Sequence, residues 1–396
     1  LSMKKRVYLV ISLGLTVSYM SKAISFYQGN DAFSRRAFTR EELAQIKPKM
    51  SSTDETSQPT LYTCSHPWML GKLGSSLFPD YIQKPLQEED PALFTEQDIV
   101  ITHPGWDCDT TLLHRHFDLR TGRKESPWNF PGKILYVNGE SIMDPRGDLD
   151  YHLGYLPDSD RSVRVFWVFI SFLYGPAGHY PPDVVAQIFQ NKRTLPSLEK
   201  KHFLIYAASN CIVYREAAFM ALAHVDTVHY AGACHGLNAG EKKVKPAPRI
   251  DQFTRTNQGN NRALFSDYRY CLVMENTKAD GYITEKIITA YLSGCVPIWY
   301  GTTEVFDLFN KDSFIYYDVE HPWVAINQIK DLEENPAKYK EMLMQPVLAN
   351  GEDTVNEFMS FSSTVGNGKL KKRIRSMMGV PDVDTFAQLK DREEID

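Results

Sequence analysis

Apolar runs separated by polar turns predict an alternating α/β chain. Most of these runs are short and end at a glycine, asparagine or proline, which is typical of buried strands in parallel βαβ units. Residues 164–175 form a longer apolar run, which fits either a buried strand or a buried helix. The predicted strands are 98–105, 133–141, 151–155, 203–208, 225–236, 271–275, 296–300 and 313–318.

One stretch, 271–301, predicts a complete strand–loop–helix–strand unit. Thr284 is expected to cap the helix with its hydroxyl, and Gly294 is expected to end it. The predicted segments are a strand over 271–275, a loop over 276–282, a helix between Thr284 and Gly294, and a strand over 296–300.

Lys286 stands in the first turn of this predicted helix, where a positive charge opposes the helix dipole. A strand that leads into a helix N-terminus within a parallel unit is an anion site, because unpaired amides point into the loop. We therefore expect an anion such as a diphosphate beside Lys286. The alternative from the residues alone is an ordinary βαβ crossover with a solvated lysine.

The same stretch resembles the donor-binding signature of the α1,3-fucosyltransferases of glycosyltransferase family 10. The resemblance rests on Glu275-Asn276, Gly281-Tyr282-Ile283-Thr284-Glu285-Lys286, Val296-Pro297 and Gly301. It covers most of 98–346 and is strongest over 203–318. The family implies an α/β fold of GT-B type, in which two Rossmann-like domains face each other across a cleft and the second binds GDP-fucose.

The N-terminus predicts a membrane attachment. An uncharged run follows a basic flank, which fits a type II signal anchor, with a cleaved signal peptide as the alternative. We expect a single-pass protein of the Golgi membrane with a lumenal catalytic part. The predicted parts are a cytoplasmic tail over 1–6, a signal anchor over 7–21, a stem over 22–60, an acceptor-side domain over 61–195, a GDP-fucose-binding domain over 196–350 and a C-terminal tail over 351–396.

Glu140 follows a glycine at the end of a predicted strand, where α/β sheets place their ligands. From position alone, a solvated turn carboxylate is the alternative. The resemblance implies that Glu140 is the general base, although 144–158 departs from the family's usual Pro-Asn-Phe-like segment.

Arg215 follows the turn at Ser209-Asn210, and the resemblance implies that it binds the donor diphosphate. A surface salt bridge is the alternative role. A planar guanidinium suits the binding of phosphate oxygens in pairs. The residues that the resemblance assigns to the donor are Ser209, Asn210, Arg215, Glu275, Asn276, Tyr282, Thr284, Glu285 and Lys286.

The implied reaction is an inverting single displacement from GDP-fucose to O3 of GlcNAc in a glycoprotein glycan, with the core GlcNAc of N-glycans as one acceptor. No metal is required, because cationic side chains neutralise the diphosphate; stimulation by Mn²⁺, known for some relatives, stays open. The alternatives are a GT-B transferase with another nucleotide sugar and an inactive lumenal glycan-binding relative. The segment 106–119 is expected to recognise the acceptor.

Composition narrows the remaining classes. The 396 residues suffice for two domains, and a hydrophobic content of 43% is typical of a protein with a full core. The net charge of −5 argues against a nucleic-acid partner. The sequence lacks Walker A, GxGxxG, HExxH and CxxC motifs.

Cysteines and the C-terminal tail carry further expectations. Cys211 and Cys234 are the expected disulfide pair, with free buried thiols as the alternative, whereas Cys271 and Cys295 are interpreted as core residues. The basic run 369–375 is predicted to be solvated, with packing back across the cleft as the alternative.

Overall fold

The structure is a computed structural model that describes residues 58–63, 67–86, 93–103, 130–139, 151–175, 188, 202–236, 242–248 and 258–382. The predicted anchor 7–21, the segment 106–119 and Glu140 lie outside these ranges. Within them, none of the helices combines the length and apolarity that a membrane span requires.

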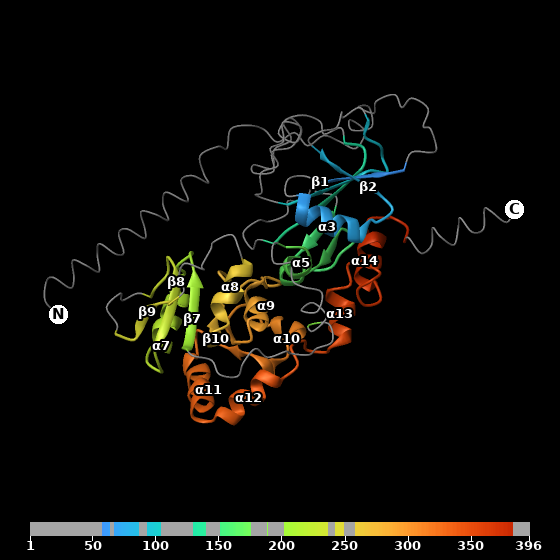
Figure 1. Cartoon of the computed structure of the whole chain (residues 1–396). Helices are drawn as coiled ribbons and strands as arrows, with labels where there is room; N and C mark the ends of the chain where they lie inside the picture. The colour runs from blue at the N-terminus through green and yellow to red at the C-terminus, as the bar shows by residue number, and fades with distance from the viewer. Residues whose placement is uncertain are drawn as a thin grey trace. The chain divides into compact units, whose positions relative to one another are not determined.

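The first sheet has the strand order β2-β1-β3-β4-β5-β6, and all of its pairs are parallel. Figure 1 shows its strands β1 and β2 beside helix α3. Strands β1 and β3 are buried throughout, as parallel strands covered on both faces must be. The elements are β1 (Thr60–Thr63), α3 (Pro67–Leu77), β2 (Ile82–Pro85), β3 (Ile99–Thr102), β4 (Lys133–Val137), β5 (Tyr151–Gly154), β6 (Ser162–Arg164) and α5 (Trp167–Tyr174).

The second sheet is also parallel, with the order β12-β11-β10-β7-β8-β9. The chain enters at β7, moves outward to β9 and returns to β10 on the other side, so the strand order reverses between β7 and β10. Such a switch point is where α/β sheets bind ligands. The elements are β7 (His202–Ala208), α7 (Val213–Leu222), β8 (Val228–Gly232), β9 (Val244–Pro246), α8 (Gln258–Phe265), β10 (Tyr268–Leu272), α9 (Lys286–Leu292), β11 (Val296–Trp299), α10 (Val305–Leu308), the 3-10 helix Lys311–Ser313 and β12 (Ile315–Tyr316).

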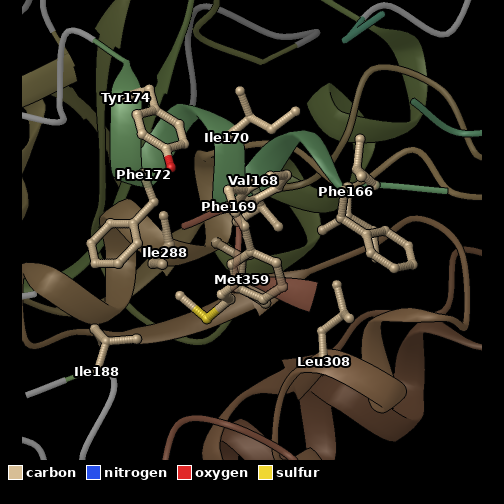
Figure 2. Close-up of a cluster of buried hydrophobic side chains, with 14 of the residues drawn as sticks. Phe166, Val168, Phe169, Ile170, Phe172, Tyr174, Ile188, Ile288, Leu308 and Met359 are labelled. Carbon is tan, nitrogen blue, oxygen red and sulfur yellow. The ribbon is translucent and has the colours of Figure 1, made fainter. Parts of the chain in front are cut away.

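The apolar run 164–175 contains the end of β6 and the buried helix α5. Figure 2 shows Phe169 of α5 among Ile288 of α9, Leu308 of α10 and Met359. A helix that is apolar on every side is stable only when other elements cover all of it. Helix α5 therefore joins buried residues of both sheets into one hydrophobic cluster.

The C-terminal helices divide between the two sheets. The basic run lies in α14 and is only partly solvated. Lys369 and Lys372 are exposed, but Arg375 is 0% exposed, and its guanidinium binds both carboxylate oxygens of Asp80 at 2.7 and 2.8 Å. Helix α14 packs against α3 and β6, so the chain returns to the first sheet. The helices are α11 (Pro322–Glu334), α12 (Pro336–Met344), α13 (Glu352–Phe358) and α14 (Lys369–Met377).

Two disulfides cross-link the second sheet. Cys211 and Cys234 are bonded as predicted. Cys271 and Cys295 are buried in the core as expected, and they form a second disulfide that the sequence did not predict. The parallel pairing of β10 with β11 brings the two cysteines together, although helix α9 separates them in the sequence.

Candidate donor-binding site

The predicted donor residues gather at the carboxyl ends of β7 and β10, beside the switch point. Ser209 and Asn210 follow β7, and Arg215 lies in the first turn of α7. The others belong to residues 273–285, called here the β10–α9 loop, or begin α9 itself. In a parallel sheet this edge is where ligands bind.

Glu275 is the centre of the β10–α9 loop. Its side chain is 0% exposed, and its carboxylate accepts hydrogen bonds from the Thr284 backbone N–H at 2.7 Å and from Lys286 Nζ at 2.8 Å. Thr284 Oγ1 lies 2.9 Å from both carboxylate oxygens. A carboxylate can be buried at low cost only when it is paired and hydrogen-bonded, so this network decides the shape of the loop.

Thr284 does not cap α9, contrary to the sequence prediction. The helix begins at Lys286, and the residue in the cap position, Glu285, makes no side-chain capping bond. The Thr284 hydroxyl is directed to Glu275 instead, because a bond to a buried charge is stronger than a bond to a neutral amide. The second prediction for this helix is confirmed, since Gly294 ends it with a φ of +70°.

Lys286 bonds to two side chains of the protein and is also partly exposed to solvent. Its ammonium donates to Glu275 and, at 2.7 Å, to Thr284 Oγ1, and 22% of the side chain is exposed. Burial alone lowers the pKa of this ammonium, but the carboxylates of Glu275 and Glu285, together with Tyr282, outweigh burial and hold the pKa above its usual value. Lys286 is therefore charged at neutral pH and held in a fixed direction.

Arg215 approaches the β10–α9 loop from α7. It is 5% exposed; its Nη1 donates to Asn276 Oδ1, and its guanidinium lies 5.6 Å from the centre of the Tyr206 ring. The adjacent residues Glu275 and Asn276 thus hold Lys286 and Arg215, respectively. Two oriented cations at the carboxyl edge of a parallel sheet are suited to a diphosphate.

Tyr214 is a site residue that the sequence reasoning missed. Its hydroxyl donates to the Glu275 backbone carbonyl at 2.5 Å, and its ring lies 5.3 Å from that of Tyr300. Burial raises the pKa of Tyr214 to about 12, although the neighbouring Arg215 lowers it. The protonated hydroxyl links α7 to the β10–α9 loop. Because its acceptor is a backbone carbonyl, no side-chain pattern reveals this contact.

The other predicted donor residues differ in their exposure. Asn210 is exposed, Ser209 and Glu285 are partly exposed, and Tyr282 is buried. Lys278 is an exposed cation of the same loop that the sequence reasoning missed, with its Nζ 5.7 Å from the centre of a tyrosine ring. The loop therefore exposes some of its polar groups, such as Lys278, whereas Glu275 and Thr284 are buried with its apolar residues.

Metal-ligating residue types come together in two places within the described ranges. In one group both sulfur atoms belong to a disulfide, so they are not available to a metal. In the other, an exposed histidine ring already bonds an aspartate at 2.9 Å. The groups are Cys211, Glu216 and Cys234, and Asp318, Glu320 and His321.

Glu140, the predicted general base, lies outside the described residues, but the residue before it does not. Gly139 follows β4 at the carboxyl edge of the first sheet. A Cβ atom at Gly139 would come within 2.2 Å of the Trp167 ring, so the chain passes α5 at a distance that only glycine allows. The role of Glu140 stays a prediction.

The fold defines an α/β protein of GT-B type with two parallel sheets. A solved α1,3-fucosyltransferase has the same fold at a TM-score of 0.52 and 20% identity, with 85% of this chain and 93% of that chain covered. The same is true of an α1,3-fucosyltransferase solved with GDP-fucose, at a TM-score of 0.50 and 20% identity, with 86% of this chain and 96% of that chain covered.

Residues 197–344 match the family model described as "Glycosyltransferase family 10 (fucosyltransferase) C-term". Over 90 residues the chain is 39% identical to the alpha-(1,3)-fucosyltransferase FucT of Helicobacter pylori, and this match covers 22% of this chain and 19% of the relative. It is 24% identical to GDP-fucose protein O-fucosyltransferase 3 of Gallus gallus over 145 residues, covering 35% of this chain and 29% of the relative. It is 25% identical to the alpha-(1,4)-fucosyltransferase of Arabidopsis thaliana over 159 residues, covering 37% of this chain and 38% of the relative. The chain thus spans less than two thirds of the length of these curated relatives.

Proposed function

We propose that the chain transfers L-fucose from GDP-β-L-fucose to a glycan or glycoprotein hydroxyl, with inversion at fucose C1. The observation that carries this proposal is the β10–α9 loop, in which Glu275 and Asn276 orient Lys286 and Arg215 at the carboxyl edge of the second sheet. The family-model match over 197–344 supports the same donor.

Arg215 and Lys286 bind the diphosphate and stabilise the negative charge that develops on GDP as the bond to fucose C1 breaks. The guanidinium of Arg215 holds phosphate oxygens in a fixed plane, whereas Lys286 supplies a compact charge. Glu275 does not touch the donor in this mechanism, because its buried carboxylate directs Lys286. The residues that we place around the sugar, ribose and phosphates are Ser209, Asn210, Asn276, Tyr282, Thr284 and Glu285.

Glu140 removes the proton of the acceptor hydroxyl, which attacks C1 from the face opposite GDP. A single displacement of this kind needs a general base and no covalent nucleophile on the enzyme. We assign O3 of GlcNAc as the acceptor, in glycoprotein glycans that include the core GlcNAc of N-glycans. The α-(1,4) and protein O-linked activities named for the relatives are the alternatives to be tested.

We further propose a Golgi protein with the anchor over 7–21 and a lumenal catalytic part, with a cleft between its two Rossmann-like domains. The disulfides Cys211–Cys234 and Cys271–Cys295 support an oxidising compartment, since disulfides persist there and are rare in reducing ones. The basic flank at residues 4–6 supports a cytoplasmic N-terminus.

The test is transfer of labelled fucose from GDP-fucose to GlcNAc-terminated N-glycans, N-acetyllactosamine and a folded protein domain. Wild type runs beside Glu140→Gln and Lys286→Met. We expect transfer to a GlcNAc acceptor and a rate loss of at least ~100-fold in both variants. Transfer from a UDP sugar, or sugar transfer that survives in Glu140→Gln, would contradict the proposal.

A further inference from the structure

Glu304 lies between the first sheet and the β10–α9 loop. It immediately precedes α10, and 23% of its side chain is exposed. One carboxylate oxygen, Oε1, pairs with Arg164 Nη1 at the end of β6. The other oxygen, Oε2, accepts the backbone N–H of Gly281 in the β10–α9 loop. One carboxylate therefore connects the first sheet to the loop of the second.

Gly281 is fixed at this point by its backbone as well. Its φ is +72°, and a Cβ atom there would lie 2.8 Å from the carbonyl oxygen of Tyr155, the residue after β5. Two residues further on, the Ile283 carbonyl accepts the N–H of Val168 in α5 at 2.9 Å. The first sheet, helix α5 and Glu304 thus all contact the middle of the β10–α9 loop.

Gly281 lies in the chain between the residues whose contacts orient Arg215 and Lys286. Asn276, which binds Arg215, comes before Gly281, and Thr284, which binds Glu275, comes after it. A displacement of Gly281 would therefore move both ends of the loop relative to the sheet edge. Small misplacements of groups that bind a reacting ligand are costly, because electrostatic stabilisation depends on preorganised geometry.

We propose that Glu304 is a positioning residue of the donor site. Its ion pair with Arg164 couples the packing of the first sheet to the conformation of the β10–α9 loop, and so to the directions of Arg215 and Lys286. The proposal deepens the proposed function and rests on it for the identity of the bound nucleotide. The hydrogen-bond coupling itself is independent of the nucleotide.

The substitution Glu304→Gln tests the two contacts because it keeps the shape of the side chain and removes one of the two acceptor oxygens. Arg164 and the Gly281 N–H are both donors, and a carboxylate can accept from both at once. An amide of the same shape has one oxygen, so in either orientation its NH₂ faces a donor. Asp307→Asn is the matched control, because Asp307 is an exposed residue of α10 and loses the same charge.

The first measurement is hydrogen exchange of the purified full chain without nucleotide, read on peptides that cover residues 276–284. Glu304→Gln is expected to exchange at least ~10-fold faster there than wild type, because a charge-assisted bond to an amide is lost. Arg164→Gln is expected to shift the same peptides, and the double variant is expected to match the larger single effect. Exchange equal to that of Asp307→Asn would overturn the proposal.

The second measurement is GDP binding by calorimetry, with donor KM and kcat. We expect Glu304→Gln to raise the GDP Kd and the donor KM by about 5- to 30-fold, with a smaller change in acceptor KM. Faster exchange with unchanged GDP affinity and unchanged kinetics would overturn the coupling to the site. If wild type binds no GDP, the proposed function fails, and the exchange comparison still decides whether Glu304 holds the loop. If Glu304→Gln does not fold, Arg164→Gln is judged by the same two criteria.

Discussion

Replacing Glu275 by glutamine tests whether one buried carboxylate builds the β10–α9 loop. The substitution preserves the shape of the side chain and removes its charge. The carboxylate now accepts from the Thr284 backbone, lies 2.9 Å from the Thr284 hydroxyl, and pairs with Lys286 at 2.8 Å. In the variant, an NH₂ group takes the place of one of the accepting oxygens, so at least one donor in the network loses its partner.

The expected cost follows from the number and type of these contacts. A hydrogen bond to a charged group contributes ~1.5–3 kcal/mol, and removing one partner of a buried ion pair costs ~3–5 kcal/mol. Since 22% of the Lys286 side chain is exposed, its ammonium recovers part of its hydration and the cost falls toward the lower value. We expect a loss of about 3 kcal/mol in the free energy of unfolding.

Urea denaturation followed by fluorescence measures this loss from the shift in midpoint at a constant slope. Glu285→Gln is the control, because it removes a charge from a partly exposed residue next to Lys286. Its free energy of unfolding is expected to stay within ~0.5 kcal/mol of wild type. In Glu275→Gln the GDP Kd should also rise about 10-fold, since Lys286 loses its direction. Equal stability of the two variants would refute the assignment of Glu275 as the centre of the loop.

Three further predictions address other contacts. Arg215→Lys keeps the charge but loses the planar fork, so GDP affinity measured by calorimetry should fall about 10- to 100-fold, and unchanged affinity would remove Arg215 from the diphosphate site. Burial lowers the pKa of His152 and His229 to about 4 from 6.5, so both take up protons on unfolding between these values. The unfolding free energy should therefore fall as the pH falls through this window, by up to about 1.4 kcal/mol per pH unit for each histidine. Urea titrations at several pH values should show that the unfolding free energy of the His152→Gln and His229→Gln variants depends less steeply on pH than that of wild type. An equally steep pH dependence in wild type and variants would contradict this. Arg375→Met leaves the Asp80 carboxylate without its buried partner and should cost about 3 kcal/mol in the same titration, so a loss below ~1 kcal/mol would contradict the structural role of α14.

Local patterns predicted most of the strands, but not β1, β2, β6 or β9, and they predicted the edge of the sheet at which the candidate site lies. The run 271–301 predicted a strand–loop–helix–strand unit, and the structure has β10, α9 and β11 there. The same pattern placed Lys286 at the start of a helix, where a cation needs a negatively charged neighbour. Periodicity and composition sufficed because these features depend on residues close in sequence.

Contacts between distant segments could not be predicted in this way. Glu275 is eleven residues before Lys286, and the sequence does not show that its carboxylate turns back to the helix start, so Thr284 was assigned to capping. The ion pair between Arg164 and Glu304 joins two sheets and has a sequence separation of 140. The sequence predicts a solvated Arg375 because its partner, Asp80, is 295 residues away in the chain. Such pairs are created by tertiary packing and leave no local signal.

The proposed donor site requires that Arg215 and Lys286 hold the diphosphate of the donor. Calorimetric titration of GDP and of guanosine tests this requirement, with wild type and with the Arg215→Met, Lys286→Met double variant. We predict that wild type binds GDP about 100-fold or more tightly than guanosine, and that the double variant binds both with similar, weak affinity. If wild type binds GDP and guanosine equally, or if the double variant keeps the preference for GDP, the two cations do not hold a diphosphate and the assignment of the site is wrong.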